Sequence, residues 1–548
     1  MITTLIQLVR EEFSGYSLST LQKDVLAGLT VGAVALPLAL AFGIASGSTA
    51  AAGLVTAILS GLIIGTLSGA PYQISGPTGA MSAVLILIAH KFGMEGVWIT
   101  GFASGVLILL IGIFKVGRMV TLIPASVITG FTSGIAIIIF VGQIQNFLGT
   151  PASTADNSIT KLFDYLRFNY TPNWQTIITA SVVMAMIFLM PKRINKRVPG
   201  SLIGLILATL LVFAFGWQEP VIGDIPRTLL LDQRLTFSTG ISSRLPELLV
   251  PILSITALGA IESLLCGVAL QESTGKKLNG DQELIAQGIG NMIMPLFGGV
   301  PATAAIARSS VGVASGGQTR VVSIVHALML LMCVFVLGPV LAEVPLAALA
   351  GVLMATAIRM NDWDEIRWLI GHRFKSSLIA FFVTMLATAA LDLTQAILLG
   401  MLISMLLFVY RSSNVQVERK DVDVTRLQSR GHSVASVHPD ISVVYLTGPM
   451  FFGAAPAFRQ AFAGHGGNRV LILSMRGVPL IDVSGIRLVE ELLNKQRQCE
   501  GSLMLCAVQP NVQRVLDRCH LTDEIGKTNF FWSADQAILA ASQRLGMM

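Results

Sequence analysis

The amino-acid sequence predicts an all-α polytopic membrane domain of fourteen segments, built as two inverted seven-segment repeats and followed by a small α/β domain. Of its 548 residues, 53% are hydrophobic and 12% are charged, about half the charged fraction of an ordinary soluble protein. Residues 1–411 hold 42 charged residues and residues 412–548 hold 26. A repeat inside the apolar part is the third observation behind this fold class.

The membrane segments are counted by length, because a helix that crosses a hydrocarbon core of about 30 Å needs about 20 residues. Ten stretches meet this requirement clearly, and four are shorter or weaker. The ten are 24–45, 51–69, 95–114, 121–142, 174–190, 198–216, 247–271, 319–342, 374–391 and 393–410. The four are 76–90, 284–297, 301–313 and 345–360.

The basic residues indicate the orientation, because Lys and Arg concentrate in cytoplasmic loops. They gather in every second connection and after the last segment, and an even number of segments keeps both termini on one side. They are Lys115, Arg118, Lys192, Arg193, Lys196, Arg197, Lys276, Lys277, Arg367, Arg373, Lys375 and Arg411. We therefore expect a cytoplasmic N-terminal segment (1–23), a membrane domain (24–411), a linker (412–429) and a cytoplasmic domain (430–548).

Two pairs of short motifs reveal the repeat. QISGPTGAM (73–81) corresponds to FGGVPATAA (297–305), and LIPASVITG (122–130) corresponds to EVPLAALAG (343–351). The prolines of the two pairs are offset by 224 and 221 residues. Because each unit holds an odd number of segments, the second must be inverted in the membrane. Short, Gly/Pro-interrupted segments in matching positions are typical of transporter binding sites.

The first motif pair predicts an anion site between two half-helices. Helix N-termini present unpaired N–H groups and about half a positive charge, and Pro fits the first helical turn. The alternative is ordinary close packing of small residues. The expected site residues are Gly76, Pro77, Thr78, Gly79 and Ala80, facing Pro301, Ala302, Thr303 and Ala304.

Glu262 is the residue most indicative of ion coupling. It lies inside the segment 247–271, where a carboxylate is unfavourable unless it is paired, hydrated or protonated. A structural hydrogen bond is the alternative. Arg308 either supplies positive charge to an anion, pairs with Glu262, or anchors its helix. Phe42 either walls the site or is ordinary packing.

The tail changes to an α/β pattern, with short apolar strands at 441–448, 469–475 and 502–508 and amphipathic helices at 484–498 and 510–521. Ser484, in LIDVSG, is expected to cap its helix or to be phosphorylated there. The five cysteines lack metal-ligand spacing, so no metal site is expected. No paired-His, CxxC or phosphate-loop motif occurs, so neither an enzyme nor an ATP-driven pump is predicted.

Several long motifs together resemble the sulfate permease (SulP) family. They are DVLAGLTVGAVALPLALAFGIASG (24–47), QISGPTGAMSAV (73–84), IPASVITGFTSGIAI (123–137), GAIESLLCGVAL (259–270), AQGIGN (286–291) and GGVPATAAIARSS (298–310). The tail resembles the STAS domain of the same family. The resemblance implies a core domain that moves like an elevator against a gate domain, and a homodimer. It also implies anion contacts around Thr78 and Ala302–Ala304, and a coupling carboxylate at Glu262.

The expected function is secondary active transport of a small anion, with H⁺ or Na⁺ as the coupling ion and no cofactor. The resemblance places Cys266 where sodium-coupled relatives carry an oxygen ligand, and sulfur suits Na⁺ poorly. This favours proton coupling, and the resemblance implies import of a dianion, such as a four-carbon dicarboxylate or sulfate, across a bacterial inner membrane. A sodium-coupled bicarbonate symporter is the first alternative, and an uncoupled channel or a membrane-anchored STAS regulator is the second. Beyond the lipid bilayer, the expected partners are a second copy and a cytoplasmic protein at the STAS domain. Nucleic acid is not expected, because the basic residues lie in short loops between apolar segments.

Overall fold

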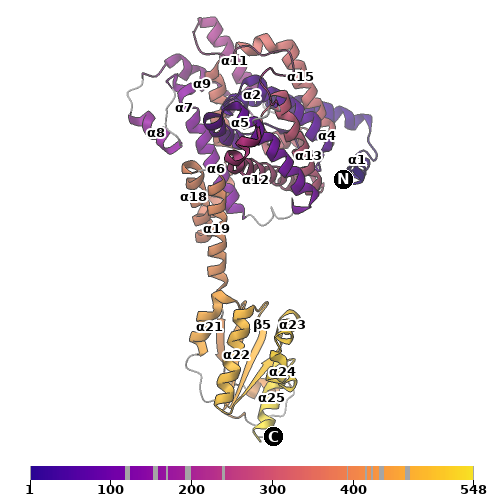
Figure 1. Ribbon diagram of the computed structural model, residues 1–548, viewed down its shortest axis with the longest axis vertical. Coiled ribbons are helices and arrows are strands. Elements are labelled where there is room, and N and C mark those ends of the chain that lie inside the picture. Colours follow the sequence, from indigo (N-terminus) through magenta and orange to yellow (C-terminus); the bar gives the residue numbers. More distant parts are fainter. Residues whose placement is uncertain are drawn as a thin grey trace. The chain divides into compact units, whose positions relative to one another are not determined.

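The chain forms two compact units, Met1–Leu402 and Ile403–Met548, shown by the colours of Figure 1. The computed structural model describes residues 2–117, 124–151, 158–167, 171–191, 199–236, 241–391, 393–413, 416–420, 422, 424–430, 437–462 and 469–546. Of the basic residues used to orient the segments, Arg118, Lys192, Arg193, Lys196 and Arg197 lie outside these ranges.

In the described part of the first unit, the named elements are helices apart from one pair of two-residue strands. Among the described residues, six helices are long and apolar enough to cross a membrane, namely Leu18–Ala45, Ala50–Leu67, Gly79–Ile113, Ala125–Leu148, Leu245–Gln271 and Val321–Ala342. Four apolar helices are shorter, namely Trp174–Leu189, Gly200–Phe215, Lys375–Ala390 and Leu398–Ser412. The count of fourteen segments stays a prediction.

The helices of this unit follow one another along the chain, with strand β1 (Ser75–Gly76) after α4 and strand β2 (Thr303–Ala304) after η3. They are α1 (Ile2–Glu12), α2 (Leu18–Ala45), α3 (Ala50–Leu59), η1 (Ser60–Ile64), α4 (Gly65–Leu67), α5 (Gly79–Ile113), α6 (Ala125–Gly142), α7 (Ile144–Leu148), α8 (Ser158–Arg167), α9 (Trp174–Leu189), α11 (Gly200–Phe215), α12 (Ile241–Thr274), α13 (Gly280–Ile293), η3 (Met294–Phe297), α14 (Ile306–Ala314), α15 (Val321–Ala342), α16 (Leu346–Arg359), α17 (Trp363–Gly371) and α18 (Lys375–Ala390). α19 (Leu393–Ser412) leads into the second unit.

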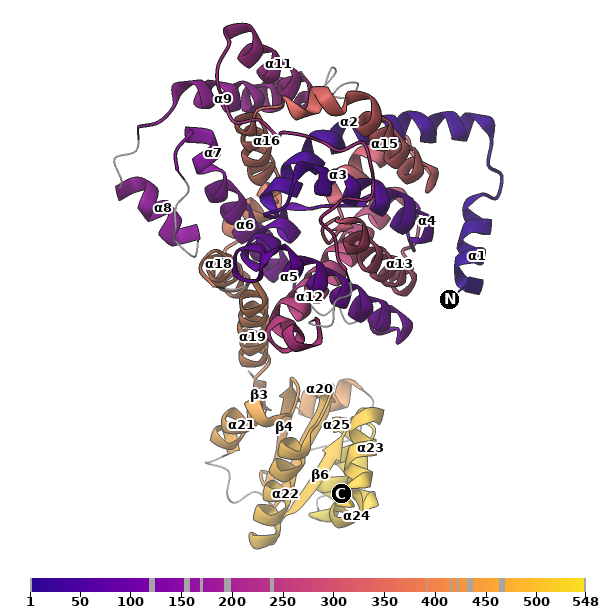
Figure 2. The same cartoon turned by 45° about the horizontal axis from the view of Figure 1, so that its top comes forward.

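Small residues let the helices approach closely. A Cβ added to Gly43 of α2 would lie 2.5 Å from the Thr49 carbonyl oxygen, and one added to Gly105 of α5 would lie 2.7 Å from the amide of Met292. Such contacts between backbones are common in membrane helix pairs, where van der Waals packing replaces the hydrophobic effect. Figure 2 shows α2, α3, α5 and α13 gathered in the middle of the first unit.

The second motif pair has the same backbone geometry in both halves. Pro124 precedes α6 with φ −64° and ψ 140°, and Pro345 precedes α16 with φ −67° and ψ 139°. A proline favours this extended conformation and cannot donate to the preceding turn. Both helices therefore begin one residue after the repeated proline.

The segments predicted at 76–90 and 95–114 are two helices joined at a kink, and the label α5 covers both. α5 runs from Gly79 to Ile113, with a break at Gly93, whose φ is 72°. That left-handed conformation suits glycine, which has no Cβ. The sequence prediction of two segments corresponds to the two sides of this break.

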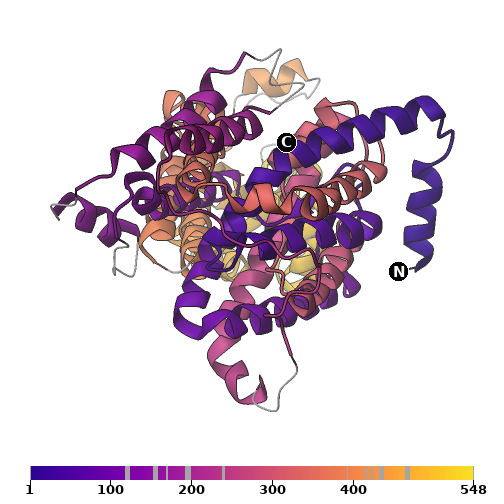
Figure 3. The ribbon, with the colours of Figure 1, turned by 90° about the horizontal axis from the view of Figure 1, so that it is seen from above.

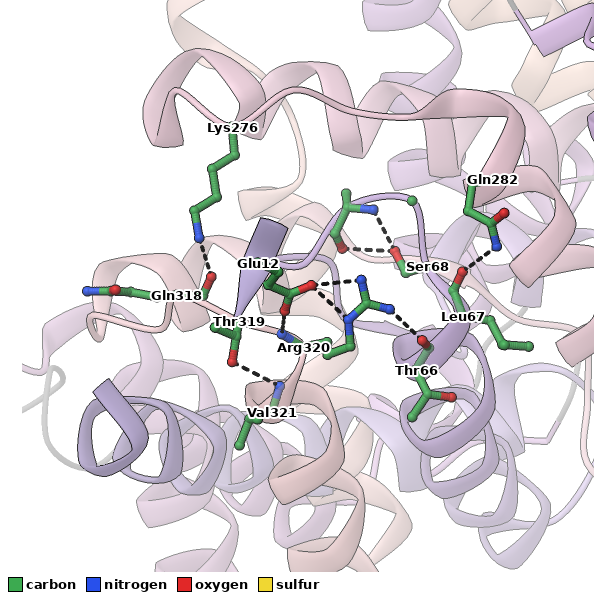
Figure 4. Close-up of polar contacts among 12 residues, drawn as sticks. Glu12, Thr66, Leu67, Ser68, Lys276, Gln282, Gln318, Thr319, Arg320 and Val321 are labelled. Atoms are coloured by element: carbon green, nitrogen blue, oxygen red, sulfur yellow. Dashed lines mark hydrogen bonds and ion pairs between the residues drawn. The ribbon is translucent and has the colours of Figure 1, made fainter. Parts of the chain in front are cut away.

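The N-terminal segment is attached to the loop before α15. Figure 3 shows α1 standing apart from α2 at the edge of the unit, and Figure 4 shows Glu12 facing Arg320. The Glu12 carboxylate accepts hydrogen bonds from the Arg320 amide (2.6 Å) and Nε (2.8 Å), and it pairs with Nη2 at 2.7 Å. Arg320 Nη1 donates to the Thr66 carbonyl at 2.5 Å. Asp24 accepts from Gln318 and Thr319 of the same loop.

The second unit is a five-stranded sheet between helices, in the order β3-β4-β5-β6-β7. β4 (Ile441–Thr447), β5 (Val470–Gly477), β6 (Ser502–Cys506) and β7 (Phe530–Phe531) are parallel, as α/β crossovers require. α22 (Val483–Gln498) and α23 (Pro510–Arg518) share one apolar cluster with the sheet, and α25 (Ala534–Arg544) shares the other. The predicted strands and helices of the tail are confirmed.

The remaining elements of the second unit are short. They are α20 (Val424–Ser429), η4 (Phe452–Ala454), α21 (Ala455–Phe462), α24 (Leu521–Ile525) and η5 (Lys527–Asn529).

Two predictions about the second unit are wrong. The proposed linker 412–429 contains β3 (Gln416–Lys420), which pairs antiparallel with β4. Its charged, exposed side chains resemble a linker in the sequence, but its backbone completes the sheet edge. The N-cap of α22 is Asp482, whose carboxylate accepts from the Gly485 amide at 3.0 Å, and Ser484 lies inside the first turn.

Candidate functional site

Two chain breaks far apart in the sequence meet as a small antiparallel ladder. β1 (Ser75–Gly76) pairs with β2 (Thr303–Ala304), in the register Ser75↔Ala304 and Gly76↔Thr303. All four residues are buried. The structure therefore brings together the two motifs that the sequence repeat predicted to face each other.

A helix begins just after each strand. Thr78 is the N-cap of α5, and its hydroxyl accepts from the Met81 amide at 3.4 Å. Ala305 is the N-cap of α14, where no side chain caps the helix. Each start leaves amides without helical partners, and the helix dipole adds positive potential there.

The predicted placement of the prolines at first helical turns is wrong. Pro77 lies between β1 and the N-cap of α5, and Pro301 lies two residues before β2. Pro77 follows its strand and Pro301 precedes its own, and because the ladder is antiparallel both prolines lie at the same end of it. The sequence comparison paired Pro77 with Pro301. In the structure, the hydrogen bonds of the ladder set the register and pair Gly76 with Thr303.

Glu262 of α12 joins the two broken segments through its carboxylate. Its Oε2 accepts a hydrogen bond from the Thr78 hydroxyl at 3.0 Å and another from the Thr303 hydroxyl at 2.7 Å. The two hydroxyl oxygens lie 3.2 Å apart. Thr78 is 5% exposed and Thr303 fully buried. One ionisable side chain thus contacts both halves of the predicted site.

The first half-site is shaped by Gly79 and Phe42. A Cβ added to Gly79 would lie 2.5 Å from Ile139 Cδ1 and 3.2 Å from Phe42 Cε1. Glycine therefore lets these apolar side chains lie directly against the start of α5. Phe42 is 4% exposed and Ala80 is equally buried, so the amides at this helix start are shielded from bulk solvent.

At the second half-site, the amides expected to bind an anion already have partners. The Ala302 amide donates to Asn291 Oδ1 at 2.7 Å, and the Ala304 amide donates to Ser263 Oγ at 3.3 Å. The prediction that Ala302 and Ala304 present free amides is therefore wrong for this structure. The first helical amides there belong to α14, which begins at Ile306.

Arg308 connects the two halves through the backbone. Its Nη2 donates to the carbonyl oxygen of Pro77, across from α14 to the segment before α5. Its side chain is 1% exposed. Among the described residues, the ion pairs do not include one between Arg308 and Glu262. The direct pairing considered from the sequence is therefore absent there, and Arg308 is held by the backbone of the first half-site.

Cys266 lies one helical turn after Glu262 and is fully buried. Its thiol donates to Ser309 Oγ at 3.6 Å, and Ser309 Oγ accepts from the Ile74 amide at 2.9 Å. Cys266 therefore contacts the β1–β2 region through Ser309.

α13 supplies polar residues that the sequence reasoning did not assign to the site. Asn291 Nδ2 donates to the Ala302 carbonyl at 2.9 Å, so this side chain binds both the amide and the carbonyl of Ala302. Gln287 donates to Ser75 Oγ at 2.8 Å and to Glu283 Oε1 at 2.9 Å. The stretch AQGIGN (286–291) contained this signal, because Gln and Asn inside an apolar segment need buried partners.

A cavity of about 340 Å³ lies away from these residues. It is lined by residues of α5, α12 and α19, including Lys91, Phe92, Glu247, Pro251 and Gln395. The residues lining it do not include Glu262 or the two threonines.

Paired broken segments within a repeated, polytopic helical domain are typical of secondary transporters. Residues 21–387 match the sulfate permease family, and residues 432–537 match the STAS domain. The chain therefore belongs to the sulfate permease family and carries a C-terminal STAS domain. Members of this family are transporters and not enzymes, and the activity that the relatives share is anion transport.

Individual relatives cover almost the whole chain. YvdB of Bacillus subtilis, a protein named for sulfate transport, is 33% identical over 96% of this chain and 98% of its own. The bicarbonate transporter BicA of Picosynechococcus is 29% identical over 94% of both chains. The solved structure of the murine anion transporter Slc26a9 in the inward-facing state has a TM-score of 0.83 and 18% identity, covering 96% of this chain and 92% of that one. That last likeness confirms the fold class.

Proposed function

We propose that the protein is a proton-coupled importer of a small dianion, such as a four-carbon dicarboxylate or sulfate, and that Glu262 carries the coupled proton. The observation behind this proposal is the position of the Glu262 carboxylate, bonded by Thr78 from one broken segment and by Thr303 from the other. A charged or titratable group that touches both halves of an anion site changes the affinity of that site when it gains a proton.

Electrostatics determine whether protonation of Glu262 strengthens or weakens anion binding. An ionised Glu262 beside the helix start of α5 repels an entering anion, and this repulsion is strong where water is excluded. Protonation removes the charge and leaves a hydroxyl that can donate to the anion. Each ligand then favours the binding of the other by the same free energy, so anion and proton are carried together.

The positive side of the site is built from backbone and one arginine. The start of α5 offers its dipole and unpaired amides, and Arg308 lies fully buried on the carbonyl of Pro77. A guanidinium keeps its charge in such surroundings. This amount of positive potential suits a dianion that arrives with a proton. The relatives named for sulfate transport support the same substrate class.

An elevator movement of the core elements against a gate, a homodimer, and a bacterial inner membrane with both termini in the cytoplasm belong to the same proposal. The shared backbone conformation at Pro124 and Pro345 supports a repeated architecture, and repeats of this kind are typical of transporters with such movements. The STAS domain would then lie in the cytoplasm, where a protein partner can reach it.

The test is uptake into Na⁺-free proteoliposomes with an inward proton gradient. Labelled sulfate, fumarate, succinate and bicarbonate are supplied one at a time, and an internal pH dye follows proton entry. Protein-free liposomes correct for CO₂, which acidifies the lumen by itself. We expect one dianion to accumulate with acidification above the control. Anion uptake without gradient-driven accumulation would contradict proton coupling.

A sodium-coupled bicarbonate symporter is the second candidate, favoured by the likeness to BicA along the chain. Against it stands Cys266, one turn from Glu262, because Na⁺ prefers oxygen ligands. Bicarbonate uptake that requires Na⁺ would select this alternative. Large currents with weak temperature dependence would indicate a channel instead.

A further inference from the structure

His326 is a buried polar side chain that the transport mechanism does not use. It lies on α15, is fully buried, and neither ring nitrogen has a hydrogen-bond partner among the described protein atoms. The backbone of Ser323 approaches the ring without reaching hydrogen-bond geometry. Buried polar groups in native proteins are almost always satisfied by protein or by ordered water, so His326 requires an explanation.

The ring faces a π-helical turn. A Cβ added to Gly61 of η1 would lie 2.8 Å from Ala327 Cβ and 3.1 Å from His326 Nδ1, so the glycine lets α15 approach η1 closely at the imidazole. η1 is a π-turn that interrupts the helix between α3 and α4, and such turns occur often at functional sites. The neighbouring Ser60 hydroxyl donates to the Ser75 carbonyl of β1 at 2.9 Å. His326 is thereby linked to the ladder at the centre of the anion site.

Two further unpartnered polar atoms lie around the same strand. Arg308 Nη1 is buried without a partner, beside the Cα of Gly76. Gln287 Oε1 is also unpartnered, while the amide nitrogen of the same side chain holds Ser75. The three side chains therefore lie around β1 and the adjoining turn η1, because Arg308 Nη1 lies at Gly76, Gln287 binds Ser75, and His326 lies at Gly61.

The chemistry of these atoms identifies what satisfies them. Arg308 Nη1 can only donate, and Gln287 Oε1 can only accept. A neutral imidazole has one donor and one acceptor. An anion would leave the acceptors unsatisfied, and a cation would be repelled by Arg308. Water both donates and accepts, and each buried water needs two to four such partners.

We infer that ordered water occupies a second buried polar site between η1, α15 and β1, held by His326, Arg308 and Gln287. This water keeps Arg308 in place on the Pro77 carbonyl, next to the N-cap Thr78. His326 is therefore a positioning residue, which acts on the anion through Arg308 without touching it. The effect on transport rests on the proposed anion site, whereas the presence of the water does not.

The direct test is an experimental structure of the full-length protein at a resolution that shows waters, about 2 Å. The expected result is at least one density peak within 3.2 Å of a His326 ring nitrogen and of Arg308 Nη1. A structure in which protein atoms satisfy these groups, or in which the region is ordered without such a peak, would overturn the water site. This outcome does not depend on which anion is transported.

Paired variants test the positioning role. His326→Leu fills a similar space without polar atoms, and His326→Gln keeps a donor and an acceptor. With labelled sulfate and fumarate as probes, we expect His326→Leu to raise the anion KM about tenfold with a smaller change in maximal rate. His326→Gln should recover most of this loss. Cys333→Ala, two turns along the same helix and also buried, controls for packing and should leave KM unchanged.

The outcomes separate the two proposals. An unchanged KM in His326→Leu, or an equal loss in His326→Gln, would overturn the positioning role. If His326→Leu does not fold, the His326→Gln kinetics and the density still decide. If the wild-type protein takes up none of the tested anions, the proposed function fails, and the water site is judged by the density alone.

Discussion

At the scale of single residues, the centre of the site consists of two threonine hydroxyls and one carboxylate. Thr78, Thr303 and Glu262 form one cluster, with both threonines bonded to the same carboxylate oxygen. A hydrogen bond to a charged group stabilises by about 1.5–3 kcal/mol. The cluster is therefore strong enough to fix Glu262 at the meeting point of the two broken segments.

Thr303→Val removes the shorter of these bonds and keeps the size and branching of the side chain. We expect proton-driven anion uptake to fall at least about tenfold, as the loss of one such bond implies, and Thr303→Ser to restore it. Thr209→Val is the control, because the Thr209 hydroxyl donates to the Leu205 carbonyl one turn earlier in α11, and this local bond should matter little for uptake. Equal uptake in Thr303→Val and wild type would contradict the role of the cluster.

The sequence predicted the members of this cluster but not their contact. Glu262 is recognisable as a carboxylate inside an apolar segment, and the threonines lie in repeated motifs. Their meeting depends on the β1–β2 ladder, which joins residues more than 200 positions apart and has no periodic pattern. The roles of Asn291 and Arg308 were missed or left open for the same reason, since both act on carbonyl groups that any residue carries.

At the scale of elements, prolines and glycines were the most useful sequence signals, although not always in the expected position. Pro124 and Pro345 mark helix starts in both halves, whereas Pro301 precedes a strand. β3 was mistaken for linker because an edge strand exposes its charged side chains and only its backbone pairs. Side-chain patterns cannot reveal such backbone pairing.

The attachment of α1 to the transport unit makes an element-scale prediction. Glu12→Gln should destabilise the first unit, because breaking a buried ion pair costs about 3–5 kcal/mol, and the Glu12 and Arg320 side chains are only 3% and 6% exposed. Thermal unfolding of detergent-solubilised protein measures the effect. Asp364→Asn breaks an exposed pair with Arg367 and is expected to change the midpoint little. Similar shifts in the two variants would show that Glu12 is not a buried anchor.

At the scale of the whole molecule, the reactivity of the five cysteines depends on their burial and on the side of the membrane on which each one lies. Cys499 and Cys519 are exposed, and Cys266, Cys333 and Cys506 are buried. Burial also raises the pKa of the Cys506 thiol to about 11, so little of the reactive thiolate exists at neutral pH. The exposed pair lies in the second unit, which the proposal places in the cytoplasm.

A membrane-impermeant maleimide should therefore label the protein in inside-out vesicles and leave it unlabelled in intact cells. The double variant Cys499→Ser/Cys519→Ser should lose the label in inside-out vesicles, which identifies the reacting sites. Labelling of the wild-type protein from outside intact cells would contradict the predicted orientation of the STAS domain.

The central claim is that Glu262 carries the coupled proton, and Glu262→Gln tests it most directly. Labelled-anion uptake and internal pH are recorded together in Na⁺-free proteoliposomes, with Glu343→Gln as a control at an exposed carboxylate. The account predicts that Glu262→Gln still binds and exchanges the anion but neither accumulates it nor acidifies the lumen under a proton gradient, while Glu343→Gln behaves as wild type. Accumulation by Glu262→Gln against a concentration gradient, with acidification equal to wild type, would contradict it.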